Sequence, residues 1–274
     1  MKKQLILLLP LSLVFVASCS GSPIYVPPVD DSDTINFSSS EEAVKPVLSL
    51  LKEDEYKSFY TYYYERINEL TSFKSVTVGK TESTANQSID ATFIKGDYSY
   101  LINKSSGMVN TSHEAYYHND KTVFKDNGKG DFAPLSKTDY LTKYGTCPLD
   151  NYIEGYIVNE DTIKEISLVK QNNGLFLVTL SLDKDSATSK VKTQMKEFGG
   201  LLEEPVFTSD ITLKLTLKDD CTPVSIDLES RYNAKKRVVI VVDASCHQTY
   251  TVTFSNINEQ IEIPKLDSVK SLLD

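Results

Sequence analysis

The chain has 274 residues, a formal net charge of −9 and a hydrophobic fraction of 40%. An acidic chain without a basic cluster is a poor match for nucleic acid, because affinity for nucleic acid depends largely on neutralising phosphates. The length is sufficient for one well-filled domain or two small ones.

Residues 1–18 have the pattern of a secretory signal. Lys2 and Lys3 precede an uncharged apolar stretch over residues 5–17. A basic start followed by about 7–15 apolar residues is typical of an export signal. The stretch is shorter than the roughly 20 residues that a membrane-spanning helix needs. We therefore expect this segment to direct export and to be removed.

Cys19 directly follows the small residues Val16, Ala17 and Ser18, an order that resembles the lipobox of bacterial lipoproteins. The resemblance implies cleavage before Cys19, a diacylglyceryl group on its sulfur, and fatty chains such as palmitate on the mature N-terminus. Leucine is usual where Val16 stands, and the alternative is a plain cleavage site followed by an unrelated cysteine. Two acyl chains hold a protein firmly to a bilayer. The lipobox thus predicts a lipid-anchored protein on the extracytoplasmic face of the cell membrane.

Residues 19–38 have the composition of a tether between this anchor and a folded part. The segment is rich in Ser, Pro and Asp, and Pro27-Pro28 favours an extended spacer. Loss of Lys2 and Lys3 with the signal changes the net charge from −9 to −11. Anionic lipid would repel such a chain, so the anchor must hold it at the membrane. We expect residues 39–274 to form a single domain.

The first expected element is an amphipathic helix between Val44 and Leu70. Apolar residues recur there at steps of three and four, which is typical of one helix face. The charged sequence KEDE at 52–55 divides the segment into two helices in an alternative interpretation. Tyr60 and Tyr63 belong to the apolar stripe. Such a stripe faces the core or, in the other interpretation, lines a ligand cavity.

Short alternating runs between residues 73 and 126 predict strands. Hairpin turns are expected at 96–97, 119–120 and 127–128, where Gly, Asn and Asp occur. The next elements are expected in this order: a helix over 136–145, a helical stripe over 149–157, strands over 163–170 and 174–182, and a helix over 185–199.

Four segments in the last third predict a four-stranded antiparallel meander: 211–218, 223–230, 238–244 and 249–256. Leu213 and Leu215 alternate with polar residues in the first segment, as Ile226 and Leu228 do in the second. Such alternation is typical of a sheet that is dry on one face. The dry face needs a cover, which the amphipathic helices can supply. The expected fold class is therefore α+β, with helices packed on the concave face of a curved antiparallel sheet.

The meander also predicts a disulfide. If its second hairpin turns at Asn233-Ala234, Cys221 and Cys246 lie directly opposite each other, within disulfide range. Disulfides persist outside the membrane, and a register shifted by one residue would forbid this pair. The alternatives are three free thiols, or Cys147 joined to either partner.

No motif in the sequence indicates catalysis, a metal or a cofactor. His113 and His118 are expected on opposite faces of a strand, and His247 stands alone. The sequence has no CxxC, HExxH or GxSxG motif and no phosphate-binding glycine loop. Cys246 is adjacent to His247, and neighbours along a strand rarely face each other. An enzyme with unpatterned carboxylates, as in glycosidases, is the alternative; we expect a non-enzyme.

The element order and the closing sequence YTVTFSNINEQIEIPKL resemble the lipoprotein-carrier superfamily, which includes LolA-like carriers and LppX/LprG-like envelope lipoproteins. The residues that carry the resemblance are Val252–Asn256 and Glu262–Pro264. The resemblance implies an incomplete β-barrel closed by helices on its concave side, with a hollow that binds acyl chains. It transfers no individual binding residue.

Two functions follow from these observations. The first is a membrane-tethered, non-enzymatic binder of a hydrophobic or amphiphilic, lipid-like ligand. Its expected lining residues are Leu213, Leu215, Ile226, Leu228, Tyr60 and Tyr63. In the competing account, the same residues close a solid core. The second function is a surface lipoprotein that binds an envelope protein partner through tyrosine-rich elements.

Overall fold

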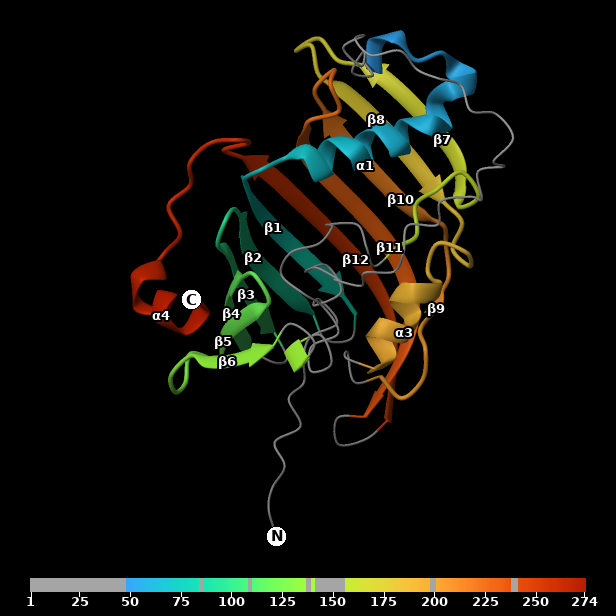
Figure 1. The fold of residues 1–274 in the computed structure, drawn as a ribbon. Helices are drawn as coiled ribbons and strands as arrows, with labels where there is room; N and C mark the ends of the chain where they lie inside the picture. The colour runs from blue at the N-terminus through green and yellow to red at the C-terminus, as the bar shows by residue number, and fades with distance from the viewer. Residues whose placement is uncertain are drawn as a thin grey trace, which may run out of the picture.

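The computed structural model describes residues 48–83, 86–107, 110–136, 139–140, 156–197, 201–237 and 241–274. Its central feature is a twelve-stranded antiparallel sheet with the order β6-β5-β4-β3-β2-β1-β12-β11-β10-β8-β7, in which β9 pairs with β11 beside this path. The sheet curves without closing, so that β6 and β7 are the outermost of the described strands (Figure 1). This arrangement confirms the expected α+β class and the curved antiparallel sheet.

The N-terminal half of the sheet is a meander of consecutive strands: β1 Phe73–Glu82, β2 Gln87–Lys95, β3 Ser99–Gly107, β4 Thr111–His118, β5 Lys121–Asp126 and β6 Ala133–Ser136. The turns expected at 96–97, 119–120 and 127–128 follow β2, β4 and β5. Asn119 and Asn127 have positive φ values of 52° and 54°, a conformation that asparagine tolerates better than most residues.

The C-terminal half consists of β7 Ile163–Lys170, β8 Phe176–Leu182, β9 Val206–Phe207, β10 Ile211–Leu217, β11 Pro223–Arg237 and β12 Val241–Ser255. The strands expected over 163–170 and 174–182 are confirmed. The first strand and the last strand of the chain, β1 and β12, pair along their length and join the two halves. The N-terminal and C-terminal meanders therefore form one continuous sheet.

The expected four-stranded C-terminal meander is wrong, because three strands, β10, β11 and β12, occupy this part of the chain, and β11 and β12 have 15 residues each. Asn233 pairs with Ser245 and Ala234 pairs with Ala244 inside the β11–β12 ladder, so the chain does not turn there. The pair Asn-Ala lacks the glycine that a tight two-residue turn favours. The β11–β12 ladder continues to the pair of Arg237 with Val241.

This register also makes the predicted Cys221–Cys246 disulfide wrong. Cys246 lies opposite Tyr232, whereas Cys221 lies in the turn before β11, with a φ of 61°. The part of β11 from Pro223 to Tyr232 separates the two positions, and it is roughly 30 Å long at about 3.3 Å per residue. Both thiols are free. Cys147 lies outside the described residues.

Few helices accompany the sheet: η2 Leu48–Leu50, η3 Glu53–Ser58, α1 Phe59–Glu69, α3 Ser189–Glu197, η4 Leu266–Ser268 and α4 Lys270–Leu273. The helical stretch expected from Val44 is divided at Leu51 and Lys52, as the charged KEDE sequence suggested, and residues 44–47 lie outside the described part. α1 crosses one face of the sheet in front of β8, β10 and β11 (Figure 1). In the described part of the chain, no helix is both long and apolar enough to span a membrane.

The two helices expected between residues 136 and 157 are described only at their ends. The Ser136 hydroxyl accepts a hydrogen bond from the Asp139 N–H at 3.1 Å, as a helix cap does. Residues 137–138 and 141–155, which belong to the two expected helices, lie outside the described residues. The helix expected over 185–199 begins later, at Ser189, and is described as far as Glu197.

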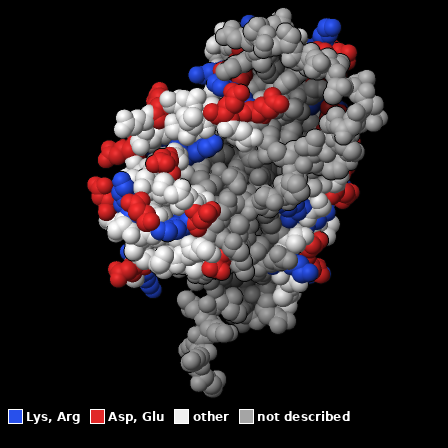
Figure 2. All heavy atoms as spheres, in the orientation of Figure 1, with Lys and Arg blue, Asp and Glu red and all other residues white. Residues whose placement is uncertain are grey.

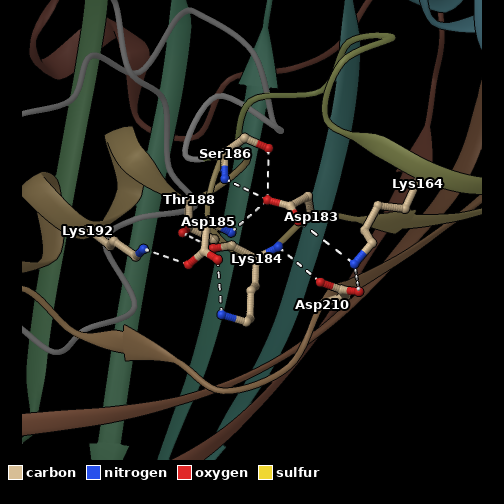
Figure 3. Close-up of polar contacts among 8 residues, drawn as sticks. All are labelled: Lys164, Asp183, Lys184, Asp185, Ser186, Thr188, Lys192 and Asp210. Atoms are coloured by element: carbon tan, nitrogen blue, oxygen red, sulfur yellow. Dashed lines mark hydrogen bonds and ion pairs between the residues drawn. The ribbon is translucent and has the colours of Figure 1, made fainter.

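A polar network fixes the turn that precedes α3 (Figure 3). Asp183 accepts hydrogen bonds from the backbone N–H and the hydroxyl of Ser186 at 2.9 and 3.0 Å. The Lys164 ammonium of β7 donates to Asp210 at 2.8 Å, and Asp210 also accepts the Lys184 N–H at 3.1 Å. The network therefore ties β7, the end of β8 and the start of β10 together.

Apolar side chains cover both faces of the N-terminal half of the sheet. On the convex face, Ile94, Tyr100, Tyr116 and Val123 pack with Val269 and Leu273 of the C-terminal segment. The Tyr116 hydroxyl donates to the Pro264 carbonyl at 2.8 Å. The opposite, concave face belongs to the main core, which continues across the whole sheet.

Charged side chains of both signs are interspersed on the described surface in Figure 2. Several of them form ion pairs, such as Arg66 with Asp220 at 3.0 Å and Lys235 with Glu203 at 2.9 Å.

Candidate functional site

The side chains on the concave face of the sheet change from apolar to polar across the strands. Strand register places a row of side chains on this face, one from each strand, from β8 to β5: Val178, Leu215, Ile226, Val252, Thr77, Ala91, Asn103, His113 and Asp126. The members on β8, β10, β11 and β12 are apolar. The members on β1 to β5 are small or polar. Along this row the concave face passes from apolar side chains, on what we call the apolar half, to small or polar ones, on what we call the polar half; outside the row, the polar half also carries buried apolar side chains such as Phe93 and Leu101.

The apolar half holds all six residues expected to line a ligand site. Leu213, Leu215, Ile226, Leu228 and Tyr63 are buried and Tyr60 is partly buried, and all belong to one continuous cluster. α1 supplies the two tyrosines from above the strands. Burial raises the pKa of Tyr63 far above its ordinary value, so the phenol stays neutral.

The burial of these six side chains bears on the competing account of a solid core. The four aliphatic side chains on β10 and β11 have 4% exposure or less, so they are packed against neighbours in the described conformation. The structure therefore brings the expected residues together, and their role in lining a ligand site stays a prediction.

The polar half begins on β1, which exposes its valines and buries its serine and threonine, the reverse of the usual pattern. Its valines, Val76 and Val78, are 38% and 57% exposed on the convex face. Ser75 and Thr77, which alternate with them, are buried on the concave face. Phe73 shares that concave face, and its ring packs 5.9 Å from Phe93 and 5.6 Å from Phe254. A shift by one residue would move Phe73 out of this cluster, so the aromatic contacts fix the register.

Gly79 allows one large side chain to lie across β1. Tyr250 of β12 is the register partner of Gly79, and a Cβ on Gly79 would lie 2.3 Å from the Tyr250 ring. Gly79 has no positive φ. The position therefore requires glycine for space and not for its backbone conformation.

A chain of buried hydrogen bonds crosses the lower end of the concave face. The Tyr156 hydroxyl donates to Ser230 at 3.2 Å, and Ser230 donates to Gln248 Oε1 at 3.3 Å. Gln248 Nε2 donates to the Tyr250 hydroxyl at 2.5 Å and lies 3.5 Å from Thr81 Oγ1. Burial holds the pKa of Tyr156 and Tyr250 well above the ordinary value. These groups are neutral donors and acceptors at physiological pH.

His113 marks the other end of the polar half. It is buried, with Nδ1 2.6 Å from Asp126 Oδ1 and Nε2 2.6 Å from the Tyr140 hydroxyl. His118 lies on the opposite face of β4, as its spacing predicted, and stacks on Tyr98 with ring centroids 4.0 Å apart. The described residues contain no cluster of three or more His, Cys, Asp or Glu side chains that could hold a metal ion.

The polar half was not predicted from the sequence. The run SVTVGK favours buried valines by the ordinary alternation rule, and the structure buries the serine and the threonine instead. A signal was present in Phe73, which lies an even number of positions from Ser75 and Thr77 and must share their face. His113 and Asp126 come together through the β4–β5 register, which single-strand patterns do not reveal.

No protein-family model matches the chain, and no curated protein matches it. Among solved structures, the Mycobacterium tuberculosis lipoprotein LppX is similar over 77% of this chain and 100% of its own, with 10% identity and a TM-score of 0.41. A LolA superfamily protein from Nitrosomonas europaea is similar over 77% of this chain and 96% of its own, with 10% identity and a TM-score of 0.30. Because these TM-scores are low, the description of the fold rests on the strand order of this chain and not on the two similar structures.

Proposed function

We propose that the protein is a membrane-anchored lipoprotein that binds or shuttles a hydrophobic or amphiphilic, lipid-like ligand at the cell envelope without catalysis. The observation that carries the proposal is the concave face, on which a single cross-strand row passes from apolar to polar side chains. From Val178 to Asp126 the row spans eight strand-to-strand steps of about 4.8 Å, or roughly 38 Å along the curve. An amphiphile has the same division into an apolar and a polar part.

The kind of ligand follows from the composition of this face. Ligand sites are concave and mostly apolar, with a few placed polar groups that fix orientation. The aliphatic side chains of β8, β10, β11 and β12 supply the apolar part. Asn103, Thr77 and the buried Gln248–Ser230 pair supply uncharged donors and acceptors. Acyl chains gain about 0.8 kcal/mol per buried methylene on such a surface.

The membrane anchor rests on the sequence, because Cys19 lies outside the described residues. Replacement Cys19→Ser in the full chain tests it. We expect loss of incorporated labelled palmitate and release of the protein from membranes into the medium. Unchanged label and unchanged location would contradict the anchor.

Ligand binding is tested with a secreted form that begins after Cys19, purified gently and analysed by native mass spectrometry and lipid extraction. We expect a co-purifying lipid-like molecule. Val252→Thr, a nearly isosteric polar change on the apolar concave row, should lower its occupancy. Val78→Thr on the exposed convex face of β1 is the matched control and should retain it. A folded protein free of any lipid would contradict the proposal.

A second candidate function is contact with an envelope protein partner. The exposed Val76 and Val78 side chains on the convex face of β1 favour it, since exposed aliphatic side chains side by side are a feature of interaction surfaces. Val78→Lys should then abolish capture of that partner in envelope extracts while leaving the lipid content unchanged.

A further inference from the structure

Three uncharged polar side chains surround Ala91 on the concave face, and we call them the polar patch: Ser75, Thr77 and Asn103. Thr77 and Asn103 flank Ala91 in the same cross-strand row, and Ser75 lies two residues before Thr77 on β1. At about 4.8 Å between strands and 3.4 Å per residue, the patch spans roughly 7–10 Å. Ala91 and the three patch side chains are buried, with 7% exposure or less.

The polar patch is buried at a cost that the fold itself does not offset. Ser75 is 1% exposed, and its hydroxyl is one of three buried side-chain hydroxyls without a hydrogen-bond partner among the described residues. It is the one within the patch. A buried hydroxyl without a partner costs about 1–3 kcal/mol.

The inverted pattern of β1 adds to this cost. Exposing Val76 and Val78 forgoes the burial of two aliphatic side chains, while Ser75 and Thr77 take their place inside. Departures of this kind, where local pattern and buried face disagree, are expected at functional sites. A ligand atom that bonds Ser75 in the complex would explain both features.

The charges of the concave face restrict what such a ligand can be. On the described parts of β1–β5, this face carries one ammonium and one carboxylate. Lys95 lies at the upper end, with Nζ 5.9 Å above the Phe73 ring, and Asp126 is engaged by His113. Within the described parts of β1–β5, an anionic group at the patch would therefore have Lys95 as its one ammonium and would have a carboxylate in the same row. An uncharged group that donates and accepts hydrogen bonds meets no such penalty.

We propose that the polar patch binds the uncharged, hydroxyl- or amide-bearing head group of an amphiphile, whose chain lies on the apolar half. The inference rests on the proposed function and adds the ligand class: a neutral hydrogen-bonding head group in preference to an anionic one. Asn103 supplies both a donor and an acceptor, and Ser75 and Thr77 each supply a hydroxyl that can do either.

The test compares two probes with the same chain, 1-lauroylglycerol and dodecyl phosphate, by calorimetric titration of the secreted form stripped of lipid. The wild type should bind the glyceride at least tenfold more tightly. Thr77→Val and Asn103→Leu should each weaken binding of the glyceride by roughly three- to tenfold, the equivalent of one lost hydrogen bond. Neither change should affect dodecyl phosphate. Thr253→Val, on the exposed convex face opposite Val76, is the matched control.

Ser75→Ala gives an independent readout, because it removes an unpartnered buried hydroxyl. We expect the lipid-free variant to melt at a higher temperature than the wild type and to show a smaller rise in melting temperature with 1-lauroylglycerol. If Ser75 had a structural role alone, the replacement would change the melting temperature of the lipid-free protein but not its rise with 1-lauroylglycerol.

The outcomes separate the two proposals. If both probes bind equally and the patch variants alter neither, the head-group site is overturned and the proposed ligand binding stands. If neither probe binds, the proposed function fails and the head-group site fails with it. If Thr253→Val has the same effect as Thr77→Val, the effect is global, and the patch assignment is overturned.

Discussion

Replacement of Gly79 by alanine should destabilise the protein, although alanine is ordinarily the better residue in a strand. The new Cβ would lie 2.3 Å from two atoms of the Tyr250 ring, whereas ordinary contact begins at 3.4 Å. Tyr250 is buried and its hydroxyl is held by Gln248 at 2.5 Å, so the ring cannot swing freely away. Overpacking of this kind destabilises a protein by about 1–3 kcal/mol. Replacing a glycine inside a strand by alanine stabilises it by about 0.5–1 kcal/mol, because the unfolded chain loses conformational freedom.

We therefore expect a net loss of about 1–2 kcal/mol in the free energy of unfolding. The melting temperature of a domain this size should fall by roughly 2–8 °C. Denaturant unfolding measures the change, and Tyr250→Leu provides the second arm of a double-mutant cycle. Without the ring, Gly79→Ala should be neutral or stabilising. An equal loss in both backgrounds would refute the assignment of this glycine to the space that Tyr250 occupies.

Three further predictions concern acid, thiols and the C-terminal segment. A hydrogen bond from a β7 lysine lowers the pKa of Asp210 below its usual value, so its stabilising effect is present above about pH 4 and lost as the pH falls through the folded pKa. Asp210→Asn should make the free energy of unfolding fall less steeply as the pH decreases below about 4. An unchanged pH dependence would contradict this role of Asp210. Burial raises the pKa of Cys221 to about 12, so a thiol reagent should label it more slowly than the half-buried Cys246, and peptide mapping without reductant should find no bond between them. Leu273→Ala should cost about 2 kcal/mol because Leu273 is buried against the convex face, whereas the exposed Leu272→Ala should change stability by under about 0.5 kcal/mol.

Elements with strong local signals could be predicted from the sequence. The strands around residues 163–182 and the turns at Asn119 and Asn127 follow from alternation and turn chemistry, and the structure has them. The C-terminal strands were divided wrongly because the continuous β11–β12 ladder passes through Asn233 and Ala234. Long cross-strand pairing overrode a weak turn signal there, and the disulfide prediction depended on that turn.

The candidate site could be predicted in its apolar half only. Leu213, Leu215, Ile226 and Leu228 alternate visibly with polar residues, so the amino-acid pattern by itself places them on a common face. Ser75 and Thr77 were missed because the face that a strand buries is decided by its partners. Here the rings of Phe73, Phe93 and Phe254 hold β1 in the register that buries its serine and threonine.

A sheet that curves without closing leaves two outer strands, and the two are protected against pairing with other chains by different means. β6 is four residues long and contains Pro134, which has no N–H to offer. β7 is longer and carries Lys164, Glu165 and Lys170, with an irregular register near its start. Replacing the charges on β7 with threonine would give neighbouring molecules a flat template for fibril-like stacking. The resistance of this fold to aggregation is therefore expected to depend on two lysines and a glutamate of β7.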